Sequence, residues 1–150
     1  SHPLVRFYDQ YDMTRANWYT NDRTSTSYYA LWGATGVGVT TPNAKSVYDP
    51  CPEGYKVPYY GAYGTSNFTA PVSNSYGITL GSYGGYYPLT GYRYAAGQTG
   101  YLMGTGGHYW TATMSSGNNA YSLGMDNNGS VLVSNQAVVS TGRAVRCIAE

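Results

Sequence analysis

The alternation of apolar and polar residues predicts a series of short strands in the second half of the chain. In the clearest case, Tyr121, Leu123 and Met125 alternate with Ser122 and Gly124. Successive side chains of a strand point to opposite faces, so this pattern is typical of a strand with one buried face. The predicted strands cover residues 87–94, 107–113, 120–125, 130–133 and 142–148.

Turn signals separate these strands, and little helix is predicted. Asp-Asn-Asn-Gly at residues 126–129 predicts a hairpin turn, because Asn-Gly tolerates positive φ. Residues 59–85 show no sustained period, so long loops are expected there, with one short strand around Ile78 and Leu80. Loops of this length in a compact domain are usually functional. One or two helical turns are predicted at residues 13–19.

Tyrosine dominates the composition, and charged residues are scarce. The chain has 19 Tyr against 2 Phe, and residues 57–142 contain only Arg93 and Asp126 as ionised side chains. Tyrosine offers a large amphipathic face with few rotatable bonds, while Ser, Asn and Gly offer adaptable hydrogen bonding, as in antibody paratopes. The composition therefore favours a surface that binds over a site that reacts.

Length and charge limit the remaining classes. A chain of 150 residues suits a single ligand-binding domain, with residues 1–14 as an arm or linker from an upstream region. The formal net charge of +1 does not favour a nucleic-acid partner, which usually requires a basic stripe. No apolar run approaches the roughly 18 residues that a membrane span needs.

The two cysteines, Cys51 and Cys147, would pair in an exported domain. Such a bridge would close a loop of about a hundred residues, for which chain-entropy models give about 4 to 5 kcal/mol. The alternative is a pair of buried free thiols in a reduced protein. Sequence spacing leaves both open, because it does not fix the distance between the two Cα atoms.

Metal ligands are few in this sequence. Asp126 with Asn127, Asn128 and Ser130 offers oxygen atoms of the kind that calcium prefers. The chain lacks the Glu-Pro-Asn and Trp-Asn-Asp patterns of calcium-dependent lectins, so a hairpin turn is favoured there. Two histidines are too few for a zinc site. No metal and no cofactor is therefore predicted.

A catalytic site would have to be built around His108, which has no carboxylate near it in the sequence. A nucleophilic mechanism would need Asp126 as the orienting group and Ser115 or Ser122 as the nucleophile, brought together by the fold. A histidine in a binding loop is the favoured alternative. No catalytic residue is therefore predicted.

Five blocks follow one another along the chain: SVYDPCPEGYKVP at 46–58, YPLTGYR at 87–93, GHYWTAT at 107–113, AYSL at 120–123 and GRAVRCI at 142–148. In this order they resemble the Fibrobacter succinogenes major paralogous domain, over about residues 15–150. The resemblance implies an α+β, predominantly β domain of C-type-lectin-like fold, with a small antiparallel sheet, long loops and little helix. Residues 59–85 are richer in Gly and Tyr, and less helical, than the family pattern implies.

The resemblance also implies a place and a role. The family is found at the C-terminal end of Bacteroides fimbrillin-like proteins and surface lipoproteins. We therefore expect an exported domain at the bacterial outer-membrane surface, following a fimbrial or lipoprotein domain. Its expected function is adhesion, and its expected partner is a protein or glycan ligand on another cell or host surface.

Some relatives of this domain are variable proteins diversified by retroelements, which mutate adenines. Asn codons then drift toward Tyr, Ser, Asp, Gly, Ala and Thr, the residue types enriched here. Placement relative to the five blocks implies the candidate ligand-binding residues. They are Tyr101, Met103, His108, Ser115, Asn118, Asn119, Ser122, Gly124, Asp126, Asn127 and Asn135.

The same blocks divide the tyrosines into two populations. Those inside blocks are expected to be packed: Tyr55, Tyr92, Tyr109 and Tyr121. Those between blocks are expected to be displayed: Tyr59, Tyr60, Tyr63, Tyr76, Tyr83 and Tyr101. Arg93 and Arg146 lie beside aromatic residues and are predicted to stack on them and donate to carbonyls. Trp110 is predicted to lie in the core.

Two other classes of function stay open. A structural subunit of a pilus or surface assembly would use a self-complementary edge or a donor strand, expected in residues 1–15. An enzyme is also compatible, because formylglycine-generating enzymes share the C-type-lectin-like fold. The enzyme hypothesis predicts a deep pocket that holds His108 and a carboxylate.

Overall fold

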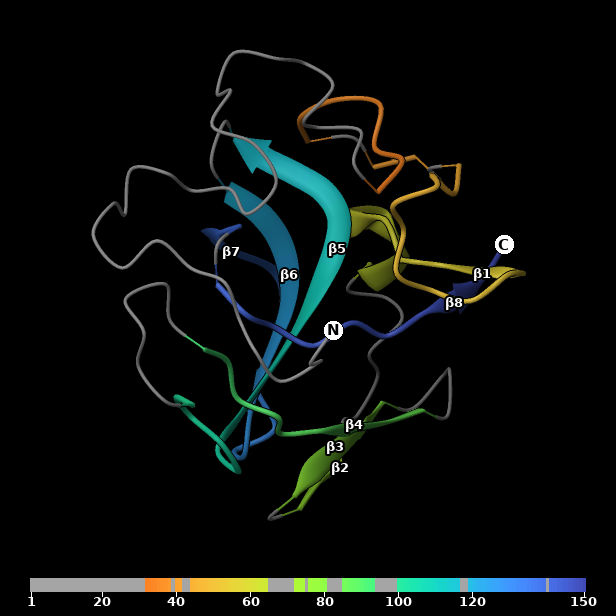
Figure 1. The fold of residues 1–150 in the computed structure, drawn as a ribbon. Coiled ribbons are helices and arrows are strands. Elements are labelled where there is room, and N and C mark those ends of the chain that lie inside the picture. Colours follow the sequence, from red (N-terminus) through yellow and green to blue (C-terminus); the bar gives the residue numbers. More distant parts are fainter. Residues whose placement is uncertain are drawn as a thin grey trace.

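The domain is mostly β in the part that the computed structural model describes (Figure 1). That part comprises residues 32–38, 40–41, 44–64, 72–74, 76–80, 85–93, 100–116, 119–139 and 141–150. Its elements are β1 (Tyr55–Lys56), the 3-10 helix η2 (Tyr60–Tyr63), β2 (Val72–Asn74), β3 (Gly77–Leu80), β4 (Gly85–Pro88), β5 (Gly106–Ser116), β6 (Asn119–Asp126), β7 (Val131–Val138) and β8 (Ile148–Ala149). The prediction of short strands with little helix is confirmed, while the helix predicted at residues 13–19 lies outside this part.

The central sheet is antiparallel, with the strand order β5-β6-β7. The predicted turn between β6 and β7 is confirmed. Oδ1 of Asp126 accepts the backbone N–H groups of Asn128 (2.9 Å) and Ser130 (3.1 Å), and Gly129 has a φ of 89°. The strand after the turn was predicted to end at residue 133, but β7 continues to Val138 because its pairing with β6 extends as far as Asn119.

The prediction of a single strand at residues 142–148 is wrong, because different parts of this segment pair with different strands. Ala144 forms a parallel bridge with Tyr109 on β5, and Arg93 forms an antiparallel bridge with Gly142. Only β8 continues beyond these bridges, and it pairs with β1. Residues 142–144 therefore extend the central sheet past β5, and residues 148–149 leave it.

The main core lies on one face of the central sheet. A second sheet of order β2-β3-β4 supplies its other side, and Figure 1 shows that sheet near one end of the molecule. Ile78 on β3 is fully buried, which confirms the predicted strand at that position. The buried residues of this cluster are Tyr63, Ile78, Tyr87, Leu89, Tyr109, Leu123 and Met125. The alternation read along residues 120–125 thus places Leu123 and Met125 in the core.

The disulfide between Cys51 and Cys147 is formed, with a Cα–Cα distance of 5.8 Å and a sequence separation of 96. It lies in a second apolar cluster with Val57 and Ala112, against which Val145 packs. The alternative of two free thiols is therefore wrong. The bridge joins the loop before β1 to the segment before β8.

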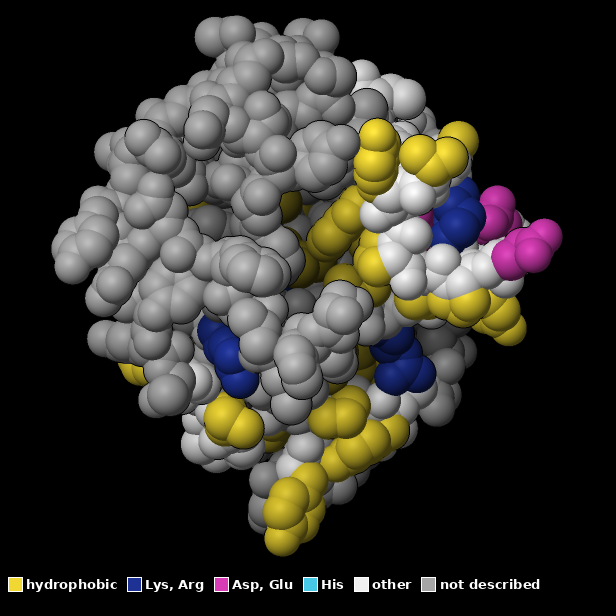
Figure 2. Space-filling model, viewed as in Figure 1, with side chains coloured by type: hydrophobic (Ala, Val, Ile, Leu, Met, Phe, Trp, Pro, Cys, Tyr) yellow, Lys and Arg dark blue, Asp and Glu magenta, His cyan; other side chains and the backbone are white. Residues whose placement is uncertain are grey.

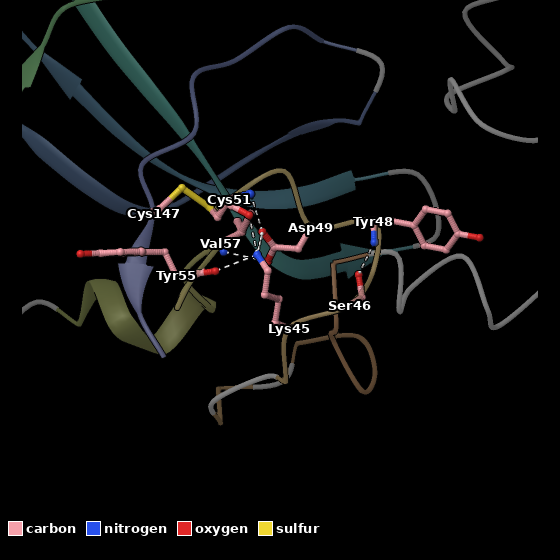
Figure 3. A network of polar contacts seen from close by, with 8 residues as sticks. All are labelled: Lys45, Ser46, Tyr48, Asp49, Cys51, Tyr55, Val57 and Cys147. Carbon is pink, nitrogen blue, oxygen red and sulfur yellow. Dashed lines mark hydrogen bonds and ion pairs between the residues drawn. A yellow bond between two sulfur atoms is a disulfide. The ribbon is translucent and has the colours of Figure 1, made fainter. Parts of the chain in front are cut away.

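A buried carboxylate organises that loop (Figure 3). Asp49 has a fully buried side chain, and its two oxygens accept the backbone N–H groups of Cys51 (2.8 Å) and Val57 (2.9 Å). Lys45 Nζ lies 3.3 Å from Asp49 Oδ1, and it donates to the carbonyls of Cys51 (2.6 Å) and Tyr55 (2.7 Å). An ammonium group has three donor hydrogens, so Lys45 has an acceptor for each of them.

The tyrosines divide differently from the expected populations. Tyr55 was predicted to be packed but is 49% exposed, because among the described strands β1 pairs with β8 alone. Tyr63 was predicted to be displayed but is 3% exposed, because η2 turns it into the main core. Tyr109 is buried and Tyr76 is 77% exposed, as expected. Tyr83 lies outside the described residues.

The remaining aromatic residues support the scaffold. Tyr60 on η2 stacks on Tyr121 with 4.2 Å between ring centroids. Trp110 is buried, as predicted. The guanidinium of Arg146 lies 4.2 Å from the ring centroid of Tyr87 and donates to a backbone carbonyl, which confirms its predicted structural role.

The surface of the described residues carries few charges. On the face drawn in Figure 2, acidic side chains gather at the edge where Figure 1 places β1 and β8. Hydrophobic side chains, tyrosines included, spread over the region of the β2-β3-β4 sheet. Arg93 is exposed, and its backbone bridges to Gly142.

Candidate functional site

A polar cluster lies on the face of the central sheet opposite the main core. The register pairs His108 with Gly124 and Trp110 with Ser122 across β5 and β6, and Ser122 with Asn135 across β6 and β7. Because side chains alternate along a strand, these residues project away from the core that Tyr109 and Leu123 enter. These polar residues therefore lie on the face opposite the main core, and on that same face Trp110 packs in a separate apolar cluster with Met114 and Ala120.

Arg143 joins this face from the segment beside β5. Ala144 donates its N–H to the carbonyl of His108 (3.1 Å) and accepts the N–H of Trp110 (2.9 Å), which fixes the register. Ala144 packs on the core side, so the preceding Arg143 points to the opposite side. Its guanidinium carbon lies 5.0 Å from the Trp110 ring centroid and 5.2 Å from that of Tyr92.

Hydrogen bonds link the members of the polar cluster. Arg143 Nη1 donates to Ser122 Oγ and lies 3.3 Å from His108 Nδ1. Asn135 Nδ2 lies 3.1 Å from the same nitrogen. Two donors pointing at Nδ1 assign it as the acceptor, so the imidazole proton is placed on Nε2. We define the polar cluster as Tyr92, His108, Ser122, Asn135 and Arg143.

The polar cluster carries one positive charge at neutral pH. Burial, assisted by the nearby charge of Arg143, lowers the pKa of His108 to about 4, so the imidazole is neutral. Burial lowers the pKa of Arg143 to about 10, against the opposing effect of Tyr92, so the guanidinium stays ionised. Arg143 has no ion-pair partner among the described residues, and its Nε is buried without a hydrogen-bond partner.

Four of the candidate ligand-binding residues meet here, but not all are displayed. His108 and Asn135 keep part of their surface exposed, whereas Ser122 and Gly124 are buried. The expectation that Ser122 and Gly124 face solvent is therefore wrong. A Cβ added at Gly124 would lie 2.7 Å from Asn135 Nδ2, and the Arg143 guanidinium bonds to Ser122, so neighbouring side chains cover both positions.

An exposed apolar loop borders the polar cluster. Tyr101 is 50%, Leu102 41% and Met103 70% exposed. The Tyr101 ring lies 5.3 Å from that of Tyr92, which in turn lies 4.8 Å from the imidazole of His108. We call Tyr101, Leu102 and Met103 the rim. Two candidate residues, Tyr101 and Met103, are thus displayed next to the cluster.

The turn after β6 lies beside the rim. The N–H of exposed Asn127 donates to the carbonyl of Thr105 (3.0 Å), and Asp126 pairs with Gly106. The Asp126 carboxylate accepts backbone N–H groups of its own turn. Of these two candidate residues, Asn127 is therefore the one whose side chain is exposed at this end of the sheet.

Two of the other candidate residues lie at the opposite end of the β5–β6 hairpin. Ser115 and Asn119 flank the turn there, and Asn119 Nδ2 donates to Ser116 Oγ (3.2 Å). Asn118 lies outside the described residues. His108 and Ser116 lie eight positions apart on β5, roughly 25 Å along an extended strand. The candidate set therefore divides between two ends of the hairpin.

The chemistry of the polar cluster fits binding through hydrogen bonds and charge. The relay considered from the sequence, Asp126 with His108 and a serine, is not formed among the described residues. His108 Nδ1 receives two donors, Ser122 bonds to Arg143, and Asp126 is held in its turn. Within the same residues, no three His, Cys, Asp or Glu side chains gather closely enough to hold a metal ion.

Arg143 and Tyr92 are the members of the cluster that were not among the candidate residues, and Arg143 is the one that carries its charge. Arg143 belongs to the GRAVRCI block, in which a structural role was predicted for Arg146 and no role for Arg143. The signal was present in the spacing, because residues 143 and 146 fall on opposite faces of an extended segment. The scarcity of carboxylates between residues 57 and 142 was a second signal that a cation packed here would lack an acidic partner.

Comparisons with known proteins add no relative. No protein-family model matches the chain, and no match was found among curated proteins or solved structures. In the described part of the chain, no helix has the length and apolarity that crossing a membrane requires. The assignment of function therefore rests on geometry and on the resemblance of the five sequence blocks.

Proposed function

We propose that this chain is a ligand-binding domain of C-type-lectin-like fold, exported to a bacterial surface and used in adhesion. It acts by non-covalent recognition. The observation that carries the proposal is the exposed rim standing directly beside a part-exposed polar cluster. An apolar rim with polar groups behind it offers a ligand both contact area and directional hydrogen bonds.

The disulfide supports the proposed location. Bridges of this kind persist in oxidising compartments and on cell surfaces, and they are rare in reduced cytosol. The Cys51–Cys147 bridge ties together segments that lie 96 residues apart in the chain. It therefore suits a small scaffold that holds its binding loops outside the cell.

The rim would supply the contact energy. Tyrosine buries a large area at low entropic cost, and tyrosine side chains at the centre of an interface often contribute most of its binding energy. A glycan ligand would place a sugar ring against Tyr101. A protein ligand would use Tyr101 and Met103 as anchors.

The exposed positions also suit diversification by a retroelement. Tyr101, Met103 and Asn127 can change without disturbing the core, whereas Ser122 and Gly124 cannot. A reverse-transcriptase gene beside an imperfect repeat of the 3′ coding region would support this part of the proposal. A neighbourhood without either element would remove it and leave the binding function standing.

The test is a glycan array combined with a panel of purified cell-surface proteins. Tyr101→Ala is the test variant. Tyr55→Ala is its matched control, because Tyr55 is equally exposed, at 49% against 50%, but lies at the β1–β8 edge. We expect Tyr101→Ala to weaken the strongest interaction about tenfold or more, and Tyr55→Ala to leave it unchanged. Equal effects of the two variants would contradict a binding role for the rim.

The competing hypothesis is a structural subunit of a pilus or surface assembly. Its predicted donor strand falls in residues 1–15, outside the described part of the chain. It predicts polymers that grow with protein concentration and lose that growth when residues 1–15 are deleted. Sedimentation velocity of the two chains separates this hypothesis from a binding domain.

A further inference from the structure

The guanidinium of Arg143 is only partly used by the protein. Its Nη1 donates to Ser122 and points at His108, while its Nε is buried without a partner. A guanidinium carries five donors in a planar fork that matches a carboxylate. Nε is therefore a donor for which the described residues provide no acceptor.

The neighbours of Arg143 select for a negatively charged, flat group. The side chains beside it add no second charge, since burial lowers the pKa of His108 to about 4 and Ser122 and Asn135 do not ionise. A buried charge is unfavourable unless an opposite charge compensates it. The ring of half-buried Tyr92 lies 5.2 Å from the guanidinium and 5.3 Å from the ring of exposed Tyr101, so aromatic side chains continue from Arg143 to the rim.

We infer that Arg143 is the anchor of an anion site, and that the proposed ligand presents to it a carboxylate carried on a ring. The carboxylate compensates the charge of Arg143, and the ring packs against the aromatic surface of Tyr92 and the rim residue Tyr101. A carboxylate fits better than a phosphate, because one guanidinium matches one negative charge and the cluster holds no second cation among the described residues. This inference rests on the proposed function and specifies its ligand.

The probes are benzoate, its neutral counterpart benzamide, acetate and phenyl phosphate. Binding at pH 7 is followed by NMR, using the ring signals of His108 and the indole N–H of Trp110. We expect benzoate to shift these signals in a saturable way and to bind about tenfold more tightly than benzamide or acetate. Equal shifts with benzamide, no shift with benzoate, or tighter binding of phenyl phosphate would each overturn the inference.

Two variants locate the effect. Arg143→Met keeps an apolar chain of similar length and is expected to abolish the preference for benzoate over benzamide, whereas Arg143→Lys should retain part of it. The comparison of benzoate with benzamide needs only the unchanged protein. It can therefore overturn the inference even if a variant fails to fold. An unchanged preference in a folded Arg143→Met protein would overturn it.

The inference and the proposed function fail separately. If Arg143→Met retains full binding to the strongest array ligand while Tyr101→Ala loses it, the binding function stands and the anion site is wrong. If Tyr101→Ala affects no array ligand while Arg143→Met abolishes the preference for benzoate over benzamide, the anion site stands and the rim is not its recognition surface.

Discussion

Lys45 and Arg143 are both part-buried cations, and they differ in what surrounds them. Lys45 faces the Asp49 carboxylate and two backbone carbonyls, so its charge and its hydrogen atoms are all matched. Arg143 faces two aromatic rings, a hydroxyl and a neutral imidazole, and its Nε has no partner. The first cation belongs to the scaffold, whereas the second is held in place with part of its bonding capacity unused.

The energetic cost of the surroundings of Arg143 indicates a functional role for this residue. A buried donor without an acceptor costs about 1 to 3 kcal/mol, and an uncompensated buried charge costs more. Cation–π contacts return about 0.5 to 2 kcal/mol each. A protein retains such an imbalance where the surrounding structure enforces it, and binding sites are where this occurs most often.

The largest effect is expected from the disulfide that anchors the Lys45 region. Replacing Cys51 and Cys147 by Ser should lower the free energy of unfolding by about 4 to 5 kcal/mol, from the loop-closure entropy of a bridge between residues 96 positions apart. Urea denaturation measures this loss. A loss below about 1 kcal/mol would show that the loop is held by its other contacts and not by the bridge.

The next effect is expected from Asp49. Asp49→Ala removes the acceptor of two backbone N–H groups and leaves Lys45 without its carboxylate, so we expect a loss of about 2 to 4 kcal/mol. Glu53→Ala is the matched control, because Glu53 is an exposed carboxylate of the same loop. Urea denaturation of the two variants should differ clearly, and equal losses would mean that the ion pair is not a structural element.

A smaller effect is expected from His108, and its sign follows from the lowered pKa. The unfolded chain takes up a proton near pH 6.5, whereas the folded protein does so near pH 4. Protons therefore favour the unfolded state in this interval, and the stability contributed by neutral His108 is lost as the pH falls from about 6.5 to 4. His108→Gln should flatten the pH dependence, and an identical slope in both proteins would contradict the buried, neutral imidazole.

Local sequence signals predicted the parts of the fold that are local. The alternation along β6 and the Asn-Gly turn depend on near neighbours, and the structure confirms both. The burial of Tyr63 was missed, because η2 meets the main core only through chain-distant contacts. The exposure of Tyr55 was missed for the same reason, since the partner of its strand is β8 at the far end of the chain.

The sequence predicted three of the five members of the polar cluster, but it predicted neither Arg143 and Tyr92 nor the exposure of each residue. His108, Ser122 and Asn135 were named from the sequence, and strand pairing brings them together. Whether a residue on a sheet face is open depends on what crosses above it, and here Arg143 covers Ser122. That placement follows from the bridge between Tyr109 and Ala144, whose partners lie far apart in the sequence.

The free energy of unfolding of Arg143→Met tests most directly whether this cation serves a ligand and not the fold. We predict a value within about 0.5 kcal/mol of the unchanged protein, or above it, because the variant removes an uncompensated charge and keeps the packing. Arg146→Met is the matched control and should lose about 1 kcal/mol, since that guanidinium stacks on Tyr87 and donates to a carbonyl. A loss of 2 kcal/mol or more for Arg143→Met, about that of Asp49→Ala, would show that Arg143 is a structural residue.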